Sequence, residues 1–109
     1  MSYDIRLTAT AKEDLRGIAF AVAEASGEKA IARCFVLEIR ETCGALRDFP
    51  LRGALPKDRV LRGMGYRYLN HQGYLIFYRV NEGESLVDIM AIFHEKMDYL
   101  RVLRRFGER

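Results

Sequence analysis

Residues 73–100 read GYLIFYRVNEGESLVDIMAIFHEKMDYL and contain two strand-like runs that end in a cluster of charged side chains. In residues 74–80, alternate side chains point to opposite faces of an extended segment, and aromatic and β-branched residues favour a pleated surface. Residues 81–85 supply Asn and Gly for a turn, and residues 86–93 are apolar at every position except Asp88. The two runs therefore predict a β-hairpin whose second strand lies inside a sheet.

The size and composition of the chain are those of one compact domain. Its 109 residues are 50% hydrophobic and 30% charged without long charged runs, so neither disorder nor low complexity is indicated. We expect residues 1–109 to form a single domain. No segment approaches the roughly 20 apolar residues of a membrane span, and the N-terminus lacks the pattern of a signal peptide. These features predict a cytoplasmic protein with no membrane role.

The cysteines and the charge distribution limit the chemistry and the partners. Cys34 and Cys43 lie nine positions apart in one predicted helix, roughly 13 Å along its axis, which is beyond disulfide reach. Neither has a CxxC partner or a His at ligand spacing, so we expect free thiols, no metal and no cofactor. Lys and Arg number 11 against seven Asp and Glu in residues 52–109, and seven against eight in residues 1–51. This bias is compatible with an RNA, DNA or acidic protein partner.

The first half of the chain predicts a strand and two helices. Residues 3–7 alternate apolar and polar side chains, as in a strand with one buried face. Thr8 or Thr10 can cap a helix, and the link at Ser26 and Gly27 is short enough to make the two helices antiparallel. Their apolar stripes are Ala11, Leu15, Ile18, Ala19, Val22 and Ala23 in the first helix and Ile31, Phe35, Ile39, Thr42 and Leu46 in the second.

The rest of the chain completes an α+β fold. Phe49–Lys57 contains both prolines and predicts the longest loop, while residues 60–71 predict a strand that ends at a Gln72–Gly73 turn. We therefore expect an N-terminal strand, an antiparallel helix hairpin and a three-stranded antiparallel meander, in one sheet with the helices on one face. The spacing of Met97, Leu100, Leu103 and Arg104 predicts a short basic C-terminal helix. The function should lie on the other, partly open face of the sheet.

Five segments in this order resemble the ParE/RelE toxin superfamily of bacterial type II toxin-antitoxin systems. They are LTATAKEDLRGI (7–18), ALRDFPLRG (45–53), GYRYL (65–69), YLIFYRV (74–80) and IFHEKMDYLRVL (92–103). The FP-x-x-G loop, the FYRV strand ending and the His-x-x-x-Asp ending look most like the ParE branch. The resemblance implies a toxin that inhibits DNA gyrase by binding it, without catalysis of its own. It also implies a ParD-like antitoxin that neutralises the toxin in a hetero-oligomer.

The alternative within this superfamily is a RelE-like endonuclease that cuts mRNA on the ribosome without a metal. Such a site needs clustered cations and an acid/base group, and by strand alignment the RelE arginine of the middle strand falls on Leu75. In the C-terminal part, Lys96 and Tyr99 could serve such a site, but the negative charges of Glu95 and Asp98 beside them would repel phosphate. We therefore expect no catalytic residue. If the chain is a nuclease, the candidates are His94, Arg67, Arg79, Lys96 and Tyr99. A third possibility is a relative that binds partners without toxicity.

Binding residues are expected among the arginines of the strands and in the C-terminal part. His94 is either a structural residue that bonds Asp98 or a backbone carbonyl, or a general acid or base. His71 is expected to be exposed and without a partner. The strand arginines either bind nucleic acid beside the tyrosines or are simply solvated, and their period-2 spacing favours the second interpretation. The predicted binding set is Arg62, Arg67, Arg79, His94, Lys96, Asp98, Leu100, Leu103 and Arg104.

Overall fold

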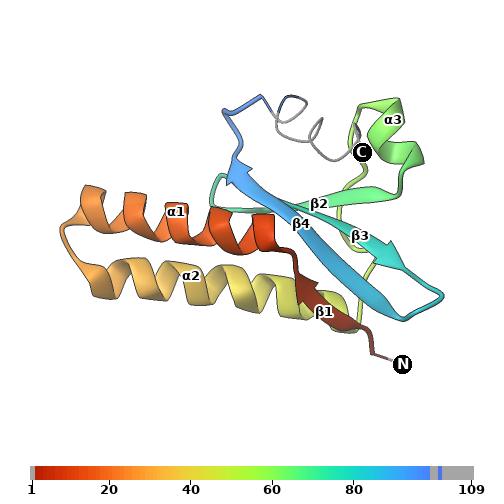
Figure 1. Ribbon diagram of the computed structural model, residues 1–109, viewed down its shortest axis with the longest axis horizontal. Coiled ribbons are helices and arrows are strands. Elements are labelled where there is room, and N and C mark those ends of the chain that lie inside the picture. The colour runs from red at the N-terminus through yellow and green to blue at the C-terminus, as the bar shows by residue number, and fades with distance from the viewer. Residues whose placement is uncertain (1, 99–100, 102–109) are drawn as a thin grey trace.

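A computed structural model describes residues 2–98 and residue 101. One sheet has the strand order β1-β4-β3-β2, and the helix hairpin α1–α2 lies against one of its faces (Figure 1). The strands are β1 (Asp4–Leu7), β2 (Tyr66–His71), β3 (Tyr74–Asn81) and β4 (Leu86–His94). The helices are α1 (Ala9–Ser26), α2 (Lys29–Gly44), the 3₁₀ turn η1 (Ala45–Arg47) and α3 (Arg59–Gly63).

The pairing of the strands confirms the meander and adds one feature that the sequence did not reveal. Strands β2, β3 and β4 are antiparallel neighbours. Strand β1 pairs with β4 in parallel, with Ile5 opposite Val87, so the sheet is mixed. A parallel pair needs a long crossover, which the two helices and the meander provide. Because β4 lies between β1 and β3, the prediction of an interior strand is confirmed.

The alternation of side chains along the strands creates two separate apolar cores. The core beneath the helices contains Ala11, Leu15, Ile18, Ile39, Cys43, Leu46, Ile76, Tyr78, Val87, Ile89 and Ile92. The core on the other face contains Leu61, Tyr66, Leu75, Phe77, Ala91 and Phe93. A β-bulge opposite Phe77 and Tyr78 inserts Met90 into β4, so Met90 and Ala91 both pack toward the second core. Both faces of the sheet are therefore packed at their centres.

The predicted strand over residues 60–71 is wrong in its first half. Asp58 caps a short helix there, because its carboxylate accepts a hydrogen bond from the Leu61 backbone N–H at 3.0 Å. Gly65, at φ 86°, then turns the chain into β2, which begins at Tyr66. The predicted turn at Gln72 and Gly73 is confirmed, since both residues have positive φ.

The helix hairpin is confirmed, with two differences in detail. Thr8 caps α1 by accepting from the Ala11 N–H, and Gly27 ends α1 in the left-handed conformation. Ile31, which we expected in the buried stripe, is 46% exposed, whereas Cys43 is buried. No helix among residues 2–98 is long and apolar enough to cross a membrane. The predicted C-terminal helix lies mostly outside the described residues.

Candidate functional site

The face of the sheet that points away from α1 and α2 carries three stacked aromatic rings. The ring centroids of Tyr68 and Phe77 are 5.2 Å apart with 23° between their planes, and those of Phe77 and Phe93 are 5.4 Å apart with 13°. Leu75 lies on the same face and is 9% exposed. We expected an open concavity here, but the centre of this face is buried, and Leu61 and Met64 of the α3 region pack against it. We call this row of rings the aromatic ladder.

The cations on this face lie at one end of the aromatic ladder and interact with other residues. The guanidinium carbon of Arg79 lies 5.6 Å from the ring centroid of Tyr66, its partner across the strands. Arg6 Nε donates to the Asp88 carboxylate at 2.8 Å. Burial raises the pKa of Tyr66, with Arg79 acting in the opposite direction, so the phenol stays neutral. Period-2 alternation correctly puts each arginine and the next residue of its strand on opposite faces. It could not predict the contact of Arg79 with Tyr66, because these residues lie on different strands.

Arg67 and Arg62 hold the long loop in place. Arg67 Nη1 donates to the carbonyl oxygens of Leu51 and Gly53, at 3.1 and 3.0 Å. Arg62 Nε donates to the Pro56 carbonyl oxygen at 3.1 Å. Arg67 follows Tyr66 in β2 and therefore points to the face opposite Arg79. The structure thus places the two arginines on different faces of the sheet.

His94 lies at the end of β4, where its Nδ1 accepts a hydrogen bond from the Lys96 backbone N–H at 3.1 Å. The ring also makes an edge contact with Tyr74, at 5.3 Å between centroids. We expected His94 to donate a hydrogen bond to Asp98 or to a backbone carbonyl. Its Nδ1 instead acts as an acceptor, for the Lys96 N–H. Lys96 and Asp98 are exposed, whereas Tyr99, Leu100, Leu103 and Arg104 lie outside the described residues.

Among the candidate nuclease residues that the structure describes, His94, Arg67 and Arg79 are not brought together. Tyr74 is the partner of His94 across the strands, and Arg79 is five residues further along β3, roughly 16 Å away at the rise of a strand. A cavity of about 720 Å³ does lie beside His94, between α1 and the end of β4, and is lined by Asp14, Ile18, Tyr74, Ile92, His94 and Met97 among others. In it, the Asp14 carboxylate accepts from the Ile92 N–H at 3.0 Å.

His71 was expected to be exposed and unpartnered, and this prediction is wrong. Its Nε2 lies 3.1 Å from a carboxylate oxygen of Glu38, and its ring packs on Phe35 with 5.6 Å between centroids. Gln72 also donates to Glu38, at 3.2 Å. His71 therefore attaches the β2–β3 turn to α2. Periodicity could not predict this contact, because Glu38 lies 33 residues away along the chain.

The outer side of the helix hairpin carries an apolar groove that the sequence interpretation missed. Its cavity of about 500 Å³ is lined by Ala19, Phe20, Ala23, Lys29, Ala32, Arg33, Val36 and Leu37. Phe20 and Leu37 are 68% and 57% exposed, although each is large and apolar. We call this feature the hairpin groove. Ala19 and Ala23, which we assigned to the buried stripe of α1, line this groove. The available signal was the pair of large apolar residues outside the two predicted stripes, Phe20 and Leu37.

The described residues provide no cluster of three or more His, Cys, Asp or Glu side chains that could hold a metal. Cys34 and Cys43 are free, as predicted. Burial raises the pKa of Cys43 to about 11, with Arg40 opposing the shift, so its thiol stays protonated and unreactive near neutral pH.

A mixed four-stranded sheet with an α-helix hairpin on one face defines the RelE/ParE-like toxin fold. Residues 5–99 match the family described as ParE toxin of type II toxin-antitoxin system, parDE, and the chain belongs to this family. It is a toxin-type protein of a type II toxin-antitoxin system.

Several solved toxin structures share this fold. The chromosomal ParDE system of P. aeruginosa matches with a TM-score of 0.70 and 22% identity, over 85% of this chain and 96% of that chain. The RelBE2 toxin-antitoxin complex of Mycobacterium tuberculosis gives 0.56 and 24%, over 86% and 99%. Isolated E. coli RelE gives 0.58 and 13%, over 96% and 99%. No protein with a curated description matches the chain significantly.

Proposed function

We propose that this toxin inhibits DNA gyrase by binding it, and that a ParD-like antitoxin neutralises the toxin by binding in turn. The aromatic ladder is the observation that carries the proposal. The resemblance implies that a RelE-like nuclease carries an arginine at the position of Leu75, on this face of the sheet, whereas Tyr68, Phe77 and Phe93 fill the face here with rings. Leu75 occupies the position that aligns with the RelE arginine, and it is buried beside them.

The separation of the remaining polar groups supports the same proposal. Cleavage of a phosphodiester without a metal requires a cation at the phosphate and an acid/base group within hydrogen-bond reach of the same reacting atoms. Arg67 and Arg79 point to opposite faces, and His94 is roughly 16 Å from Arg79 along the strands. These three side chains cannot act on one phosphate in this arrangement.

The hairpin groove supports an antitoxin as the second partner. An amphipathic helix that folds on binding needs a long apolar groove to bury its own apolar face. The hairpin groove offers Phe20 and Leu37, with Lys29 and Arg33 at its rim to receive acidic side chains. We place the antitoxin tail here, in a hetero-oligomer with the toxin.

The test uses purified toxin with purified DNA gyrase in a supercoiling assay, together with programmed ribosomes in a separate mRNA cleavage assay. The proposal expects loss of supercoiling and accumulation of gyrase-linked DNA breaks, with the mRNA intact. Cleavage of ribosome-bound mRNA by toxin that leaves gyrase active would establish the nuclease alternative instead. Normal growth after induction, without either effect, would indicate the non-toxic relative.

A further inference from the structure

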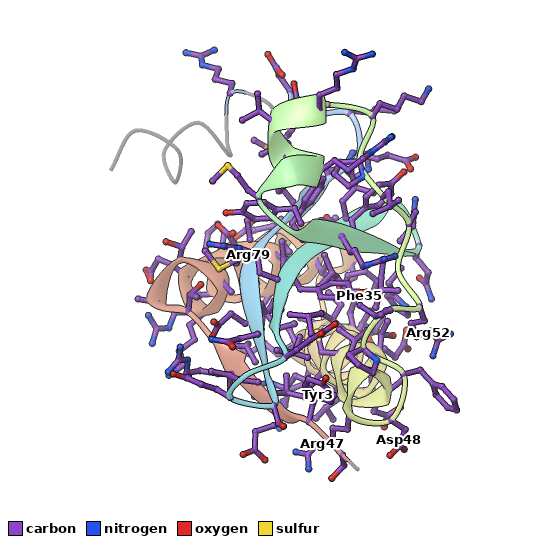
Figure 2. The ribbon with its side chains drawn as sticks, turned by 90° about the vertical axis from the view of Figure 1, so that its right-hand side faces the viewer. Tyr3, Phe35, Arg47, Asp48, Arg52 and Arg79 are labelled. Atoms are coloured by element: carbon purple, nitrogen blue, oxygen red, sulfur yellow. The ribbon has the colours of Figure 1, made fainter. Side chains whose placement is uncertain are left out.

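The long loop between η1 and β2 exposes large apolar side chains although its backbone is held firmly. Phe49 is 67% exposed, Leu51 51%, Leu55 46%, and Val60 at the start of α3 is 68% exposed. Exposed cations surround them: Arg47, Arg52, Lys57, Arg59 and Arg62. Figure 2 shows this segment running from Asp48 past Arg52 to α3, along one end of the molecule. We call these nine side chains the loop surface.

The backbone of this segment is fixed by a set of contacts with the sheet. Ala54 and Tyr68 exchange both backbone hydrogen bonds, at 2.9 and 3.0 Å. The Gly53 N–H donates to the Tyr78 hydroxyl at 2.9 Å, and Arg67 donates to two loop carbonyls. Gly53 and Pro56 are buried between the exposed residues. The loop surface is thus ordered before any partner arrives, which lowers the entropic cost of binding.

We propose that the loop surface is where the toxin docks on its protein target, and that the target offers an acidic surface with an apolar pocket. This inference rests on the proposed function, because it assigns the target contact of the same toxin. Exposed apolar side chains on an ordered loop are the typical anchors of an interface, while the surrounding cations steer an acidic partner. Within residues 47–62, only Asp48 and Asp58 are acidic, and Asp58 is occupied as the cap of α3.

A small cavity next to the loop surface supports a protein as the partner. It has a volume of about 240 Å³ and is lined by Leu51, Leu55, Arg62, Gly65, Tyr66, Arg67, Val80 and Glu82. Its two leucines suit an apolar side chain, and its two arginines outnumber the single carboxylate of Glu82, so an acidic group beside that side chain is favoured. A base would instead require flat aromatic surfaces for stacking. Tyr66, the aromatic residue that lines this cavity, is only 1% exposed, and the loop surface itself contains one aromatic residue, Phe49.

Two other occupants fit this surface less well. A second copy of the chain would bring the same five cations against each other, which is unfavourable across an interface. An antitoxin tail that orders on binding needs a groove, and the hairpin groove provides one on the α1–α2 hairpin. The large apolar side chains of the loop surface are about half exposed or more, which suits their insertion into a pocket of the partner. A folded target with its own pocket is therefore the best match.

The test compares loop variants with matched changes elsewhere on the surface. Leu51→Ser is paired with Ile31→Ser on α2, where the exposed fractions are 51% and 46%. Arg52→Glu is paired with Arg40→Glu, also exposed on α2. Each protein is induced in cells to score growth arrest. Each is also purified to measure its affinity for the antitoxin, taken as the small protein encoded directly upstream of the toxin. Circular dichroism and thermal unfolding check the fold.

Leu51→Ser and Arg52→Glu should each weaken growth arrest and gyrase inhibition by about 30-fold, the effect of losing one interface anchor. Their affinity for the antitoxin should stay within about threefold, and the α2 variants should match wild type in every assay. Full growth arrest by both loop variants would overturn the inference, as would loss of antitoxin binding alone. The affinity for a 30-nucleotide RNA is measured as well. If Arg52→Glu weakens RNA binding as much as it weakens gyrase inhibition, the partner is a nucleic acid and the inference is overturned.

The two proposals fail in different ways in this experiment. If wild-type toxin arrests growth without inhibiting gyrase, the gyrase target is wrong, and growth arrest by the loop variants still decides the docking surface. If wild type inhibits gyrase and the loop variants do so equally, gyrase is the target and the loop surface is not the contact. A wild-type protein that neither arrests growth nor inhibits gyrase would overturn both.

Discussion

The backbone N–H of Gly53 donates a hydrogen bond to the buried hydroxyl of Tyr78 at 2.9 Å. This contact joins the long loop to the middle of β3 across 25 residues of sequence. It serves both partners, because the buried amide gains an acceptor and the buried phenol gains a donor. Burial raises the pKa of Tyr78, although the Gly53 hydrogen bond acts in the opposite direction. The phenol stays neutral through the physiological range and remains available to the loop.

Replacement of Gly53 should therefore destabilise the protein and disturb the loop surface. A Cβ at this position would lie 2.8 Å from the Tyr68 carbonyl oxygen and from Tyr78 Cε1, with the Tyr78 hydroxyl closer still. Gly53→Ala should lower the free energy of unfolding by about 1–3 kcal/mol, measured by urea denaturation. Gly17→Ala is the control, since nothing lies within 4 Å of the added atom and alanine favours the helix. A Gly53→Ala protein as stable as wild type would show that the loop can move away.

The attachment of the β2–β3 turn to α2 should be measurable at His71. His71→Ala removes the contacts with Glu38 and Phe35, and should lower the free energy of unfolding by about 1–2 kcal/mol. Gln72→Ala removes only the exposed side-chain bond to Glu38 and should cost less than about 0.5 kcal/mol. Urea denaturation of both variants checks the difference. Equal small losses would mean that the His71 contact contributes little in solution.

Two phenylalanines should respond in opposite ways to truncation. Phe77, at 1% exposed, is the middle ring of the aromatic ladder, so Phe77→Ala should cost about 3–5 kcal/mol in thermal or urea unfolding. Phe20 is 68% exposed, so Phe20→Ala should change stability by less than about 0.5 kcal/mol. It should instead weaken antitoxin binding by about tenfold or more, measured by calorimetry. Unchanged antitoxin affinity in this variant would exclude the hairpin groove as the antitoxin site.

The sequence predicted most of the fold because its patterns are local. The alternation in residues 74–80 and 86–93 marked two strands, and the helix stripes with Gly27 between them marked the hairpin. The error over residues 60–65 arose because a single cap, Asp58, starts a short helix at residues that we had assigned to a strand. The parallel pairing of β1 with β4 depends on a crossover, which periodicity cannot reveal.

The candidate site was less predictable because its residues meet across large sequence separations. Alternation along β2 predicted correctly that Tyr66 and Arg67 point to opposite faces, but it could not show that Tyr66 lies opposite Arg79. The contact of His71 with Glu38 and the hydrogen bond of Gly53 with Tyr78 were also unpredictable, because each joins residues far apart in the sequence. The loop itself was recognised from its prolines. Its exposed apolar side chains were not interpreted, because only the structure shows which of them are left unburied.

His94 provides a test between a structural and a catalytic role. Its Nδ1 accepts from the Lys96 N–H and its ring contacts Tyr74, which are the contacts of a residue that shapes the exit from β4. His94→Ala should cost about 1 kcal/mol of stability and leave growth arrest largely intact. His94→Gln, which keeps a hydrogen-bond acceptor, is the conservative comparison. Complete loss of toxicity in both variants, with an unchanged circular dichroism spectrum, would point to a nuclease.

The raised pKa of Cys43 makes the stability of the protein depend on alkaline pH. The folded protein keeps this thiol neutral up to about pH 11, whereas an unfolded chain loses the proton near the ordinary pKa of 9.0. The contribution of the neutral Cys43 thiol to the free energy of unfolding is therefore fully present below pH 9. It is lost as the pH rises toward 11, because unfolding then releases a proton. The slope is about 1.4 kcal/mol per pH unit at most.

The two cysteines allow this contribution to be separated from other alkaline titrations. The stability difference between wild type and Cys43→Ala, measured by urea denaturation, should narrow by about 1 kcal/mol from pH 8 to pH 10. In the native protein at pH 8, a thiol reagent should label the exposed Cys34 rapidly and Cys43 only after unfolding. Rapid labelling of two thiols in the folded state would show that solvent reaches Cys43, and the pH effect should then vanish with the burial that causes it.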